Sequence, residues 1–467
     1  MKYKNVSKNT IFLGDINVHI PYEDGQVREI SPNQILKSNT FQMSIIQGLI
    51  EPVEFGDSNI ELFLKTKVGQ KNSAKSKKEN LLNKESDEAE GSSENTAMIR
   101  GHVFDQTGYG KVNRNLAKVI SKLGYKVCLD STSTFRHQLT KEELEEIKEF
   151  TLGVKNVDLQ IDSIIPTFSE SRTFGKKRIL YTTIEAETVP ESFKDLFSNY
   201  HDIWVTSNFC KNVIEKQGIA SDVKVVHPFI DSSLYNESAD PYKFDPPLKD
   251  FVFISVFGWS YRKGYDALLR AYFEEFNAND NVSLLIVSKY QNSPERSEII
   301  KNDIQGIIEK FDKKTAPHIA RYSKLIPEKE MPSIYRACDC FVLPSRGEGF
   351  GLPYCEASLS GLPCIATKHS GVLDFLDDDN SFLVEPDGLE PVSPGKMHVH
   401  YWDNHVFPKL TSDKFICDLK SKMRFVYENL EIAKKRNKLL QRKLKKEYNI
   451  KTISYNIKKI LHDYIIK

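Results

Sequence analysis

The feature that most constrains the fold is a glycine-rich stretch between an apolar run and a helix-forming segment. Residues 340–344 (CFVLP) are apolar throughout, as in a strand buried on both faces of a parallel sheet. The loop SRGEGFG follows at 345–351, and residues 353–362 favour a helix before a second apolar run at 363–367. Strand, glycine loop, helix and strand in this order predict an α/β domain with a parallel sheet.

The start of that helix has the character of an anion site with carboxylates beside it. Glycines let the loop backbone approach a ligand closely, and Pro353 suits the first turn of a helix. The free N–H groups and dipole of a helix start attract phosphate. Glu348 lies in the loop, and Glu356 lies about one turn into the helix. Carboxylates beside a phosphate need hydroxyl groups to donate to them, so the pattern predicts a phosphorylated polyol such as a nucleotide sugar.

The stretch EGFGLPYCE, with its Glu-x7-Glu spacing, resembles the donor site of retaining GT-B glycosyltransferases of family 4 (glycosyl transferases group 1). The resemblance covers about residues 97–467. It implies that Glu348 holds the donor sugar and Glu356 the ribose hydroxyls. It also implies that loop N–H groups bind the sugar and diphosphate, at Gly349, Phe350, Gly351 and Leu352. The alternative is a capped, solvated helix start with no ligand.

Composition indicates a soluble cytoplasmic protein. The formal net charge of +1 gives no reason to expect nucleic acid or an acidic polymer as the main partner. The N-terminus has no apolar signal core, and no run approaches the roughly 20 apolar residues of a membrane span. The basic stretch 434–446 is expected to be a solvated helix face, and peripheral contact with an anionic membrane is the alternative. The seven cysteines predict buried, reduced thiols rather than a zinc site. Asp377–Asp379 predicts a surface turn, and neither a metal nor a cofactor is expected beyond the nucleotide-sugar substrate.

The first part of the chain predicts a small β-rich module over residues 1–65 and a flexible linker over 66–96. Strands are expected around 11–13 and 16–20 and from Ile50 onward, with a short helix between Ser38 and Gln47. The linker is poor in apolar residues and passes from a lysine-rich to an acidic stretch. The module either docks a partner, mediates self-association or is only a structural cap.

A first Rossmann-like domain is expected over residues 97–228. A strand at 98–104, a loop at 105–110 and a helix at 112–123 open it. The resemblance implies that Gly108 and Gly110 close over the donor phosphates, whereas a plain tight turn is the alternative. Glu185 and Glu187 follow a later strand, at the edge where α/β folds bind ligands. The resemblance makes them candidates for acceptor binding, and solvated acids at a helix start are the alternative.

A second Rossmann-like domain is expected over 229–410. Its first strand, 251–257, ends in GWSYRKG, so Arg262 and Lys263 face the same cleft as Glu348. Two cations there can neutralise a diphosphate as negative charge develops on it. The resemblance adds Gly258 to the donor site. Many family members carry an arginine where this chain has Trp259, and whether Arg262 replaces it stays open. Lys324 and Leu325 are the positions where the family binds the base, mostly through backbone atoms.

Residues 411–467 predict helices, and the resemblance implies that the last of them packs back on the N-terminal domain. The expected fold is therefore α/β of the GT-B type: two Rossmann-like domains facing across a cleft, with a small N-terminal β-rich module. The resemblance implies metal-independent transfer of a sugar from a nucleotide-diphosphate sugar to an acceptor hydroxyl, by same-face substitution with retention. Arg262, Lys263 and Glu348 would be its catalytic residues. The alternatives are a non-catalytic sugar-nucleotide-binding or scaffolding partner of another glycosyltransferase, and a sugar phosphorylase. The donor base, the sugar and the acceptor (polysaccharide, lipid-linked glycan, protein or modified nucleic acid) stay open.

Overall fold

The structure is a computed structural model that divides into two compact units, Met1–Ser93 and Glu94–Lys467. It describes residues 2–5, 11–13, 18–20, 27–29, 50–54, 95–132, 139–152, 156–165, 174–220, 222–288, 294–311, 315–324, 326–394, 396 and 402–465.

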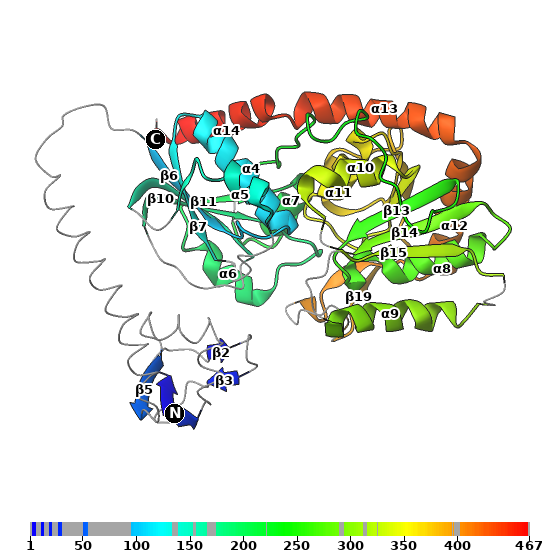
Figure 1. Ribbon diagram of the computed structural model, residues 1–467. Coiled ribbons are helices and arrows are strands. Elements are labelled where there is room, and N and C mark those ends of the chain that lie inside the picture. The colour runs from blue at the N-terminus through cyan, green and yellow to red at the C-terminus, as the bar shows by residue number, and fades with distance from the viewer. Residues whose placement is uncertain are drawn as a thin grey trace, which may run out of the picture. The chain divides into compact units, whose positions relative to one another are not determined.

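Antiparallel strands form the described part of the first unit (Figure 1). β1 (Lys2–Asn5) pairs with β4 (Val27–Glu29) on one side and β5 (Ile50–Glu54) on the other. A separate hairpin joins β2 (Ile11–Leu13) to β3 (Val18–Ile20). The β-rich character predicted for this module is therefore present. The predicted helix at 38–47 and almost all of the predicted linker lie outside the described residues.

The second unit begins with an α/β domain built on a parallel sheet. Within the described residues the strand order is β12-β11-β10-β9-β6-β7-β8, and all neighbours are parallel. The strands are β6 (Thr96–Gly101), β7 (Lys126–Ser131), β8 (Thr151–Leu152), β9 (Val157–Ser163), β10 (Gly175–Thr182), β11 (Asp202–Val205) and β12 (Val223–Val225). The helices are α4 (Gly108–Lys122), α5 (Lys141–Glu146), α6 (Glu191–Phe197) and α7 (Asn208–Lys216).

The second α/β domain has the sheet order β15-β14-β13-β16-β17-β18, again all parallel among the described residues. Its strands are β13 (Phe251–Phe257), β14 (Val282–Ser288), β15 (His318–Tyr322), β16 (Cys340–Leu343), β17 (Cys364–Thr367) and β18 (Phe382–Val384). Its helices are α8 (Tyr265–Glu275), α9 (Pro294–Ile308), α10 (Met331–Arg336), α11 (Leu352–Leu359), α12 (Asp413–Glu428) and α13 (Leu430–Glu447). Short 3₁₀ turns are η1 (Tyr261–Lys263), η2 (Glu328–Glu330) and η3 (Ser370–Asp374), and a two-stranded ribbon joins β19 (Leu389–Pro391) to β20 (Val406–Pro408).

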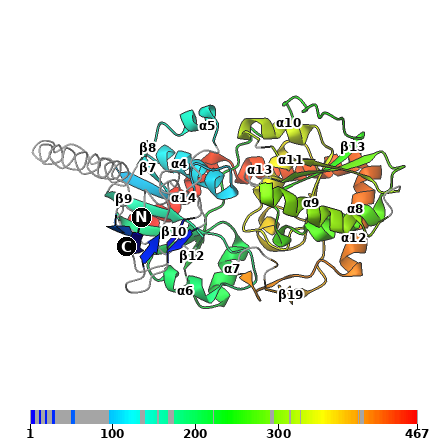
Figure 2. The same ribbon diagram turned by 60° about the horizontal axis from the view of Figure 1, so that its bottom comes forward.

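The last helix returns to the first α/β domain. α13 lies along the second domain, and α14 (Ile450–Ile465) continues to the other one (Figures 1 and 2). There Ile453, Ile457 and Leu461 are buried in the cluster that holds Ile99 of β6 and Leu116 of α4. Burial of this apolar stripe ties the two α/β domains together at the end of the chain.

The start of the first α/β domain differs from its prediction. β6 ends at Gly101 rather than at residue 104, and α4 begins at Gly108 rather than at 112. Thr107 causes the earlier start, because its side chain accepts a hydrogen bond of 3.1 Å from the Gly110 N–H and so caps the helix. Gly108 and Gly110, predicted in a loop, therefore form the first turn of a helix.

The surface turn predicted at Asp377–Asp379 and the predicted free thiols are both present. Asp377–Asp379 lies in a turn whose Asp377 carbonyl accepts from the Ser381 N–H at 3.0 Å, and Asp378 is exposed. All seven cysteines are free thiols, and Cys417 is the exposed one. Among the described residues no three His, Cys, Asp or Glu side chains gather as a metal site would require. None of the described helices has the length and apolar character needed to cross a bilayer.

Candidate active site

A cavity of about 600 Å³ lies between the two α/β domains. The start of α4 and the end of β10 line it on one side, and the end of β13 with the glycine-rich loop lines it on the other. The carboxyl ends of parallel strands, where α/β folds bind ligands, thus meet a helix start at one space. Of the site residues predicted from sequence, those on the cavity wall are Gly108, Glu185, Gly258, Arg262, Lys263, Lys324, Glu348, Gly349, Phe350, Gly351, Leu352 and Glu356.

The turn η1 presents Arg262 and Lys263 to this cavity. Its end, Gly264, has φ +68°, and a Cβ there would lie 1.8 Å from the Pro344 carbonyl oxygen. Only glycine fits that conformation and that approach. The Arg262 carbonyl accepts from the Arg346 N–H at 2.7 Å and from the Ser345 hydroxyl at 3.2 Å. The turn is therefore fixed against the glycine-rich loop.

Opposite charges from both domains converge at η1. The Lys263 Nζ lies 2.6 and 2.8 Å from the two carboxylate oxygens of Glu348. The Arg262 guanidinium lies 2.9 Å from a carboxylate oxygen of Glu185, and 3.5 Å from one of Glu348. It also donates to the Gly347 carbonyl. Two cations and two carboxylates thus balance one another in a largely buried cluster.

Burial and charge give the two carboxylates different acidities. Burial acts to raise the pKa of Glu348, but the charges of Lys263 and Arg262 outweigh it, so the pKa lies below its usual value. For Glu185 burial outweighs the attraction of Arg262 and Lys263, and the pKa is raised. Burial, followed by the repulsion of Arg262, lowers the pKa of Lys263. Glu348 is therefore held as a carboxylate, and Glu185 takes a proton more readily.

The backbone of Glu348 is fixed by η3. The Glu348 N–H donates to the Ser370 hydroxyl at 2.9 Å, and the Glu348 carbonyl accepts from the Gly371 N–H at 2.9 Å. Ser370 has φ +69°, a backbone conformation that residues other than glycine rarely adopt. These two contacts hold the backbone of Glu348, whose carboxylate lies at the cavity.

The glycines of the loop allow a close approach, but in this structure they approach the protein itself. A Cβ at Gly347 would lie 1.8 Å from the Glu185 carbonyl oxygen, and one at Gly349 would lie 1.4 Å from the Thr183 hydroxyl. Both partners belong to the segment that follows β10 in the other domain. The glycine-rich loop is thus also the contact surface between the domains.

Helix α11 begins directly after this loop, with Pro353 at its second position. The Glu356 carboxylate lies one turn further on, as its spacing predicts. It accepts from Lys111 Nζ at 2.6 Å and from the Tyr335 hydroxyl at 3.1 Å. Glu356 therefore links α11 to α4 of the other domain.

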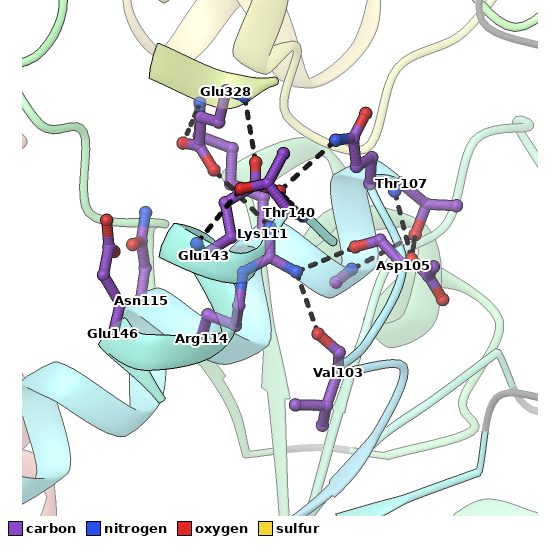
Figure 3. Close-up of polar contacts among 12 residues, drawn as sticks. Val103, Asp105, Thr107, Lys111, Arg114, Asn115, Thr140, Glu143, Glu146 and Glu328 are labelled. Atoms are coloured by element: carbon purple, nitrogen blue, oxygen red, sulfur yellow. Dashed lines mark hydrogen bonds and ion pairs between the residues drawn. The ribbon is translucent and has the colours of Figure 1, made fainter. Parts of the chain in front are cut away.

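On the α4 side, Asp105 fixes the loop that leads into the helix (Figure 3). Its carboxylate accepts from the Thr107 N–H at 3.0 Å and from the Thr107 hydroxyl, and its other oxygen lies 2.6 Å from the His102 ring. Burial acts to raise the pKa of Asp105, but the His102 and Thr107 hydrogen bonds lower it to about 2. The fixed loop places Gly108 at the cavity.

Two of the predicted site residues that the structure describes are not on the cavity wall. Gly110 faces Asp105 instead, because a Cβ there would lie 2.4 Å from the Asp105 carbonyl oxygen. The Glu187 carboxylate lies 3.4 Å from His369 Nε2, and its N–H donates to the Val406 carbonyl. Leu325 lies outside the described residues.

Several wall residues were missed by sequence reasoning. Trp259 lines the cavity, but its indole N–H donates to Asp303 at 2.8 Å and its ring stacks on Tyr265 at 4.3 Å between centroids. It thus packs against α8 and α9, and Arg262 is the guanidinium on the cavity wall beside it. Lys111, Tyr235 and Glu328 also line the cavity. The one signal in the sequence that could have identified Lys111 is its position directly after the Gly-x-Gly pair.

The comparisons with known proteins agree with this geometry. A family model described as "Glycosyl transferases group 1" matches residues 249–392, which hold η1, the glycine-rich loop and Glu356. A mannosylfructose-phosphate synthase of Agrobacterium fabrum is 31% identical over 112 residues, 24% of this chain and 24% of that protein. A D-inositol 3-phosphate glycosyltransferase of Corynebacterium kroppenstedtii is 37% identical over 73 residues, 16% of each. The chain therefore spans only a minor part of the length of either relative.

Solved structures share the fold over most of the chain. A sucrose-phosphate synthase from Thermosynechococcus elongatus superposes with TM-score 0.57 at 14% identity, over 79% of this chain and 99% of that one. The Anabaena protein HepE, solved with UDP and glucose, superposes with TM-score 0.54 at 13% identity, over 79% and 100%. The described residues between 95 and 465 thus form two Rossmann-like domains facing each other across a cleft, the GT-B fold.

Proposed function

We propose that this chain is a retaining glycosyltransferase of family 4 that moves a sugar from a nucleotide-diphosphate sugar to an acceptor hydroxyl. The observation that carries the proposal is the cluster of Lys263, Arg262 and Glu348 beside the start of α11, on the wall of the cavity between the domains. The match of residues 249–392 to glycosyl transferases group 1 supports it independently.

In this proposal the diphosphate lies between η1 and the start of α11. Arg262 and Lys263 neutralise the negative charge that grows on the leaving diphosphate, and the free N–H groups of α11 add to this. Two fixed side-chain cations can do this work without a divalent ion, so we propose that turnover is independent of metal. Glu348 accepts from a hydroxyl of the donor sugar, and Glu356 accepts from the ribose.

The reaction is then a same-face substitution. The bond between the anomeric carbon and the diphosphate oxygen breaks, and the acceptor oxygen bonds to that carbon on the same face. The acceptor hydroxyl gives its proton to the departing diphosphate oxygen. Catalysis thus comes from positioning and electrostatics. We further propose that Glu185, from the 97–228 domain, contacts the acceptor, because it lies on the cavity wall beside Arg262.

The test is release of nucleoside diphosphate from a panel of UDP-, GDP- and ADP-sugars, with cell extract as the source of acceptor. We expect release from one donor, unaffected by a chelator and lowered at least tenfold in Glu348→Gln. The matched control is Glu385→Gln, since Glu385 is an exposed glutamate of the same domain, 3.7 Å from Lys368. Binding of a donor with no turnover would favour a non-catalytic partner. Unchanged turnover in Glu348→Gln would contradict the role of the loop.

A further inference from the structure

Lys111 reaches across the cleft from α4 and is fully hydrogen-bonded on the other side. Its Nζ lies 2.6 Å from Glu356 Oε1, 2.8 Å from the Tyr235 hydroxyl and 2.9 Å from Glu328 Oε1. An ammonium has three N–H donors, and each has an acceptor here. All three acceptors follow the first α/β domain in the chain, so the contact joins the two sides of the cavity.

The ammonium keeps its charge although it is buried. Burial acts to lower the pKa of Lys111, but the charges of Glu356 and Glu328 outweigh it and raise the pKa above its usual value. Both carboxylate oxygens lie within 2.9 Å of the same nitrogen. Lys111 is therefore a cation that the two carboxylates share, and its charge favours their lying close together.

Glu328 is held by further residues of the same domain as Lys111 (Figure 3). Its carboxylate lies 3.5 Å from Arg114 Nη2, and its N–H donates to the Glu143 carboxylate at 2.9 Å. Glu143 is itself fixed in a capping box with Thr140. Arg114 also donates to the Asp105 carbonyl at 2.8 Å. Residues of α4 and α5 thus hold η2 through Glu328. Several contacts therefore set the position of Lys111 relative to Glu356.

Glu356 retains room for a ligand while it is held. Lys111 occupies one oxygen and the Tyr335 hydroxyl the other, at 3.1 Å. A carboxylate offers about four acceptor positions, so each oxygen can accept one more hydroxyl group. The vicinal hydroxyls of a ribose would match these two positions.

We propose that Lys111 is a positioning residue that aims the Glu356 carboxylate at the donor ribose. The inference rests on the proposed function for the ribose role of Glu356. If Lys111 served stability alone, its replacement would lower the melting temperature. The folded variant would then keep the wild-type Michaelis constant for the donor.

The experiment compares Lys111→Met with Lys118→Met, a lysine of the same helix that pairs at the surface with Glu146. For the donor identified in the panel, we expect Lys111→Met to raise KM at least tenfold, with a smaller fall in kcat. Lys118→Met should stay within twofold of wild type. A double variant, Lys111→Met with Glu328→Gln, should have a KM at least threefold lower than that of Lys111→Met, because it removes one of the two facing carboxylates that shared the ammonium.

The outcomes separate this inference from the proposed function. A wild-type KM in folded Lys111→Met, or an equal loss in Lys118→Met, would overturn the positioning role. The absence of recovery in the double variant would also contradict it, because simple loss of packing is not relieved by removing a charge. Binding of UDP, GDP and ADP by calorimetry is the second measurement. If wild type binds a nucleotide without turnover, the proposed function fails, yet tenfold weaker binding by Lys111→Met still supports the inference.

Discussion

Arg346 and Asp266 form a two-point ion pair beneath the turn that carries Arg262 and Lys263. Both guanidinium nitrogens lie 2.8 Å from the Asp266 carboxylate oxygens, and the Arg346 side chain is fully buried. The guanidinium also stacks on the Tyr261 ring, 3.6 Å from its centroid, and donates to the Tyr261 carbonyl at 2.7 Å. Arg346 therefore fixes η1 to the glycine-rich loop.

This pair predicts the effect of Asp266→Asn. The variant leaves a buried guanidinium without its counter-charge, so we expect the free energy of unfolding to fall by about 3 kcal/mol. Chemical denaturation measures it. The control is Asp378→Asn, because Asp378 forms an exposed ion pair with Lys368 at 2.8 Å. Removing this surface pair should change the free energy of unfolding by less than about 0.5 kcal/mol. Equal stability of the two variants would contradict the anchoring role.

The contact between Gly347 and Glu185 predicts a strong effect of a single methyl group. In Gly347→Ala the Cβ would meet a backbone oxygen of the other domain at 1.8 Å, and a backbone atom cannot rotate away. We expect the cleft to open and nucleoside diphosphate release to fall at least tenfold. Gly306→Ala is the control, because Gly306 lies in α9 with nothing within 4 Å of its added Cβ. It should raise stability by about 0.5–1 kcal/mol and leave turnover unchanged. Equal turnover in the two variants would show that the loops do not meet in the active form.

The pair Glu185 and Glu187 separates the acceptor proposal from a general effect of charge. Glu185 lines the cavity and pairs with Arg262, whereas Glu187 does not line it and lies beside His369. We therefore expect Glu185→Gln to lower sugar transfer to the acceptor at least tenfold while slow hydrolysis of the donor continues. Glu187→Gln should stay within twofold of wild type. Labelled donor, followed into product and into free sugar, measures both. Equal transfer by the two variants would remove Glu185 from the acceptor site.

The fold and one side of the cavity could be predicted because their signals are local. The strand at 340–344, the glycine-rich loop and Glu356 lie within twenty residues of sequence, and their spacing alone places them together. The GWSYRKG turn is equally compact and follows a largely apolar strand that is buried throughout. Strand, loop and helix alternation then fixes the edge of the sheet at which both groups lie.

The contacts across the cleft could not be predicted in the same way. Lys111 is 245 positions from Glu356, and no periodicity connects a lysine on one helix to a glutamate on another. The family resemblance implies that Gly110 lies at the donor phosphates, but the Thr107 cap begins the helix earlier than predicted, and Gly110 faces Asp105. Glu187 has the same residue type and nearly the same position as Glu185. In the fold, however, its carboxylate lies beside His369 and its N–H donates to the Val406 carbonyl.

His369 predicts how stability depends on pH. Its imidazole is largely buried against Phe209, with ring centroids 5.2 Å apart, and burial lowers its pKa to about 4. The unfolded chain should titrate near pH 6.5. Between these values the unfolded state binds more protons than the folded state, so stability falls as pH falls from about 6.5 to about 4.

Replacing this imidazole should remove that part of the pH dependence. When the pH is lowered from 6.5 to 4.5, the free energy of unfolding of His369→Gln should fall by about 2 kcal/mol less than that of wild type. The variant also removes the neighbour of Glu187. Denaturation at a series of pH values measures the difference. Burial also lowers the pKa of His318 and His405, and their contributions cancel in the comparison because both proteins keep them. Parallel stability curves for the two proteins over this range would mean that the folded protein already accommodates a charged His369, with the Glu187 carboxylate 3.4 Å away as its counter-charge.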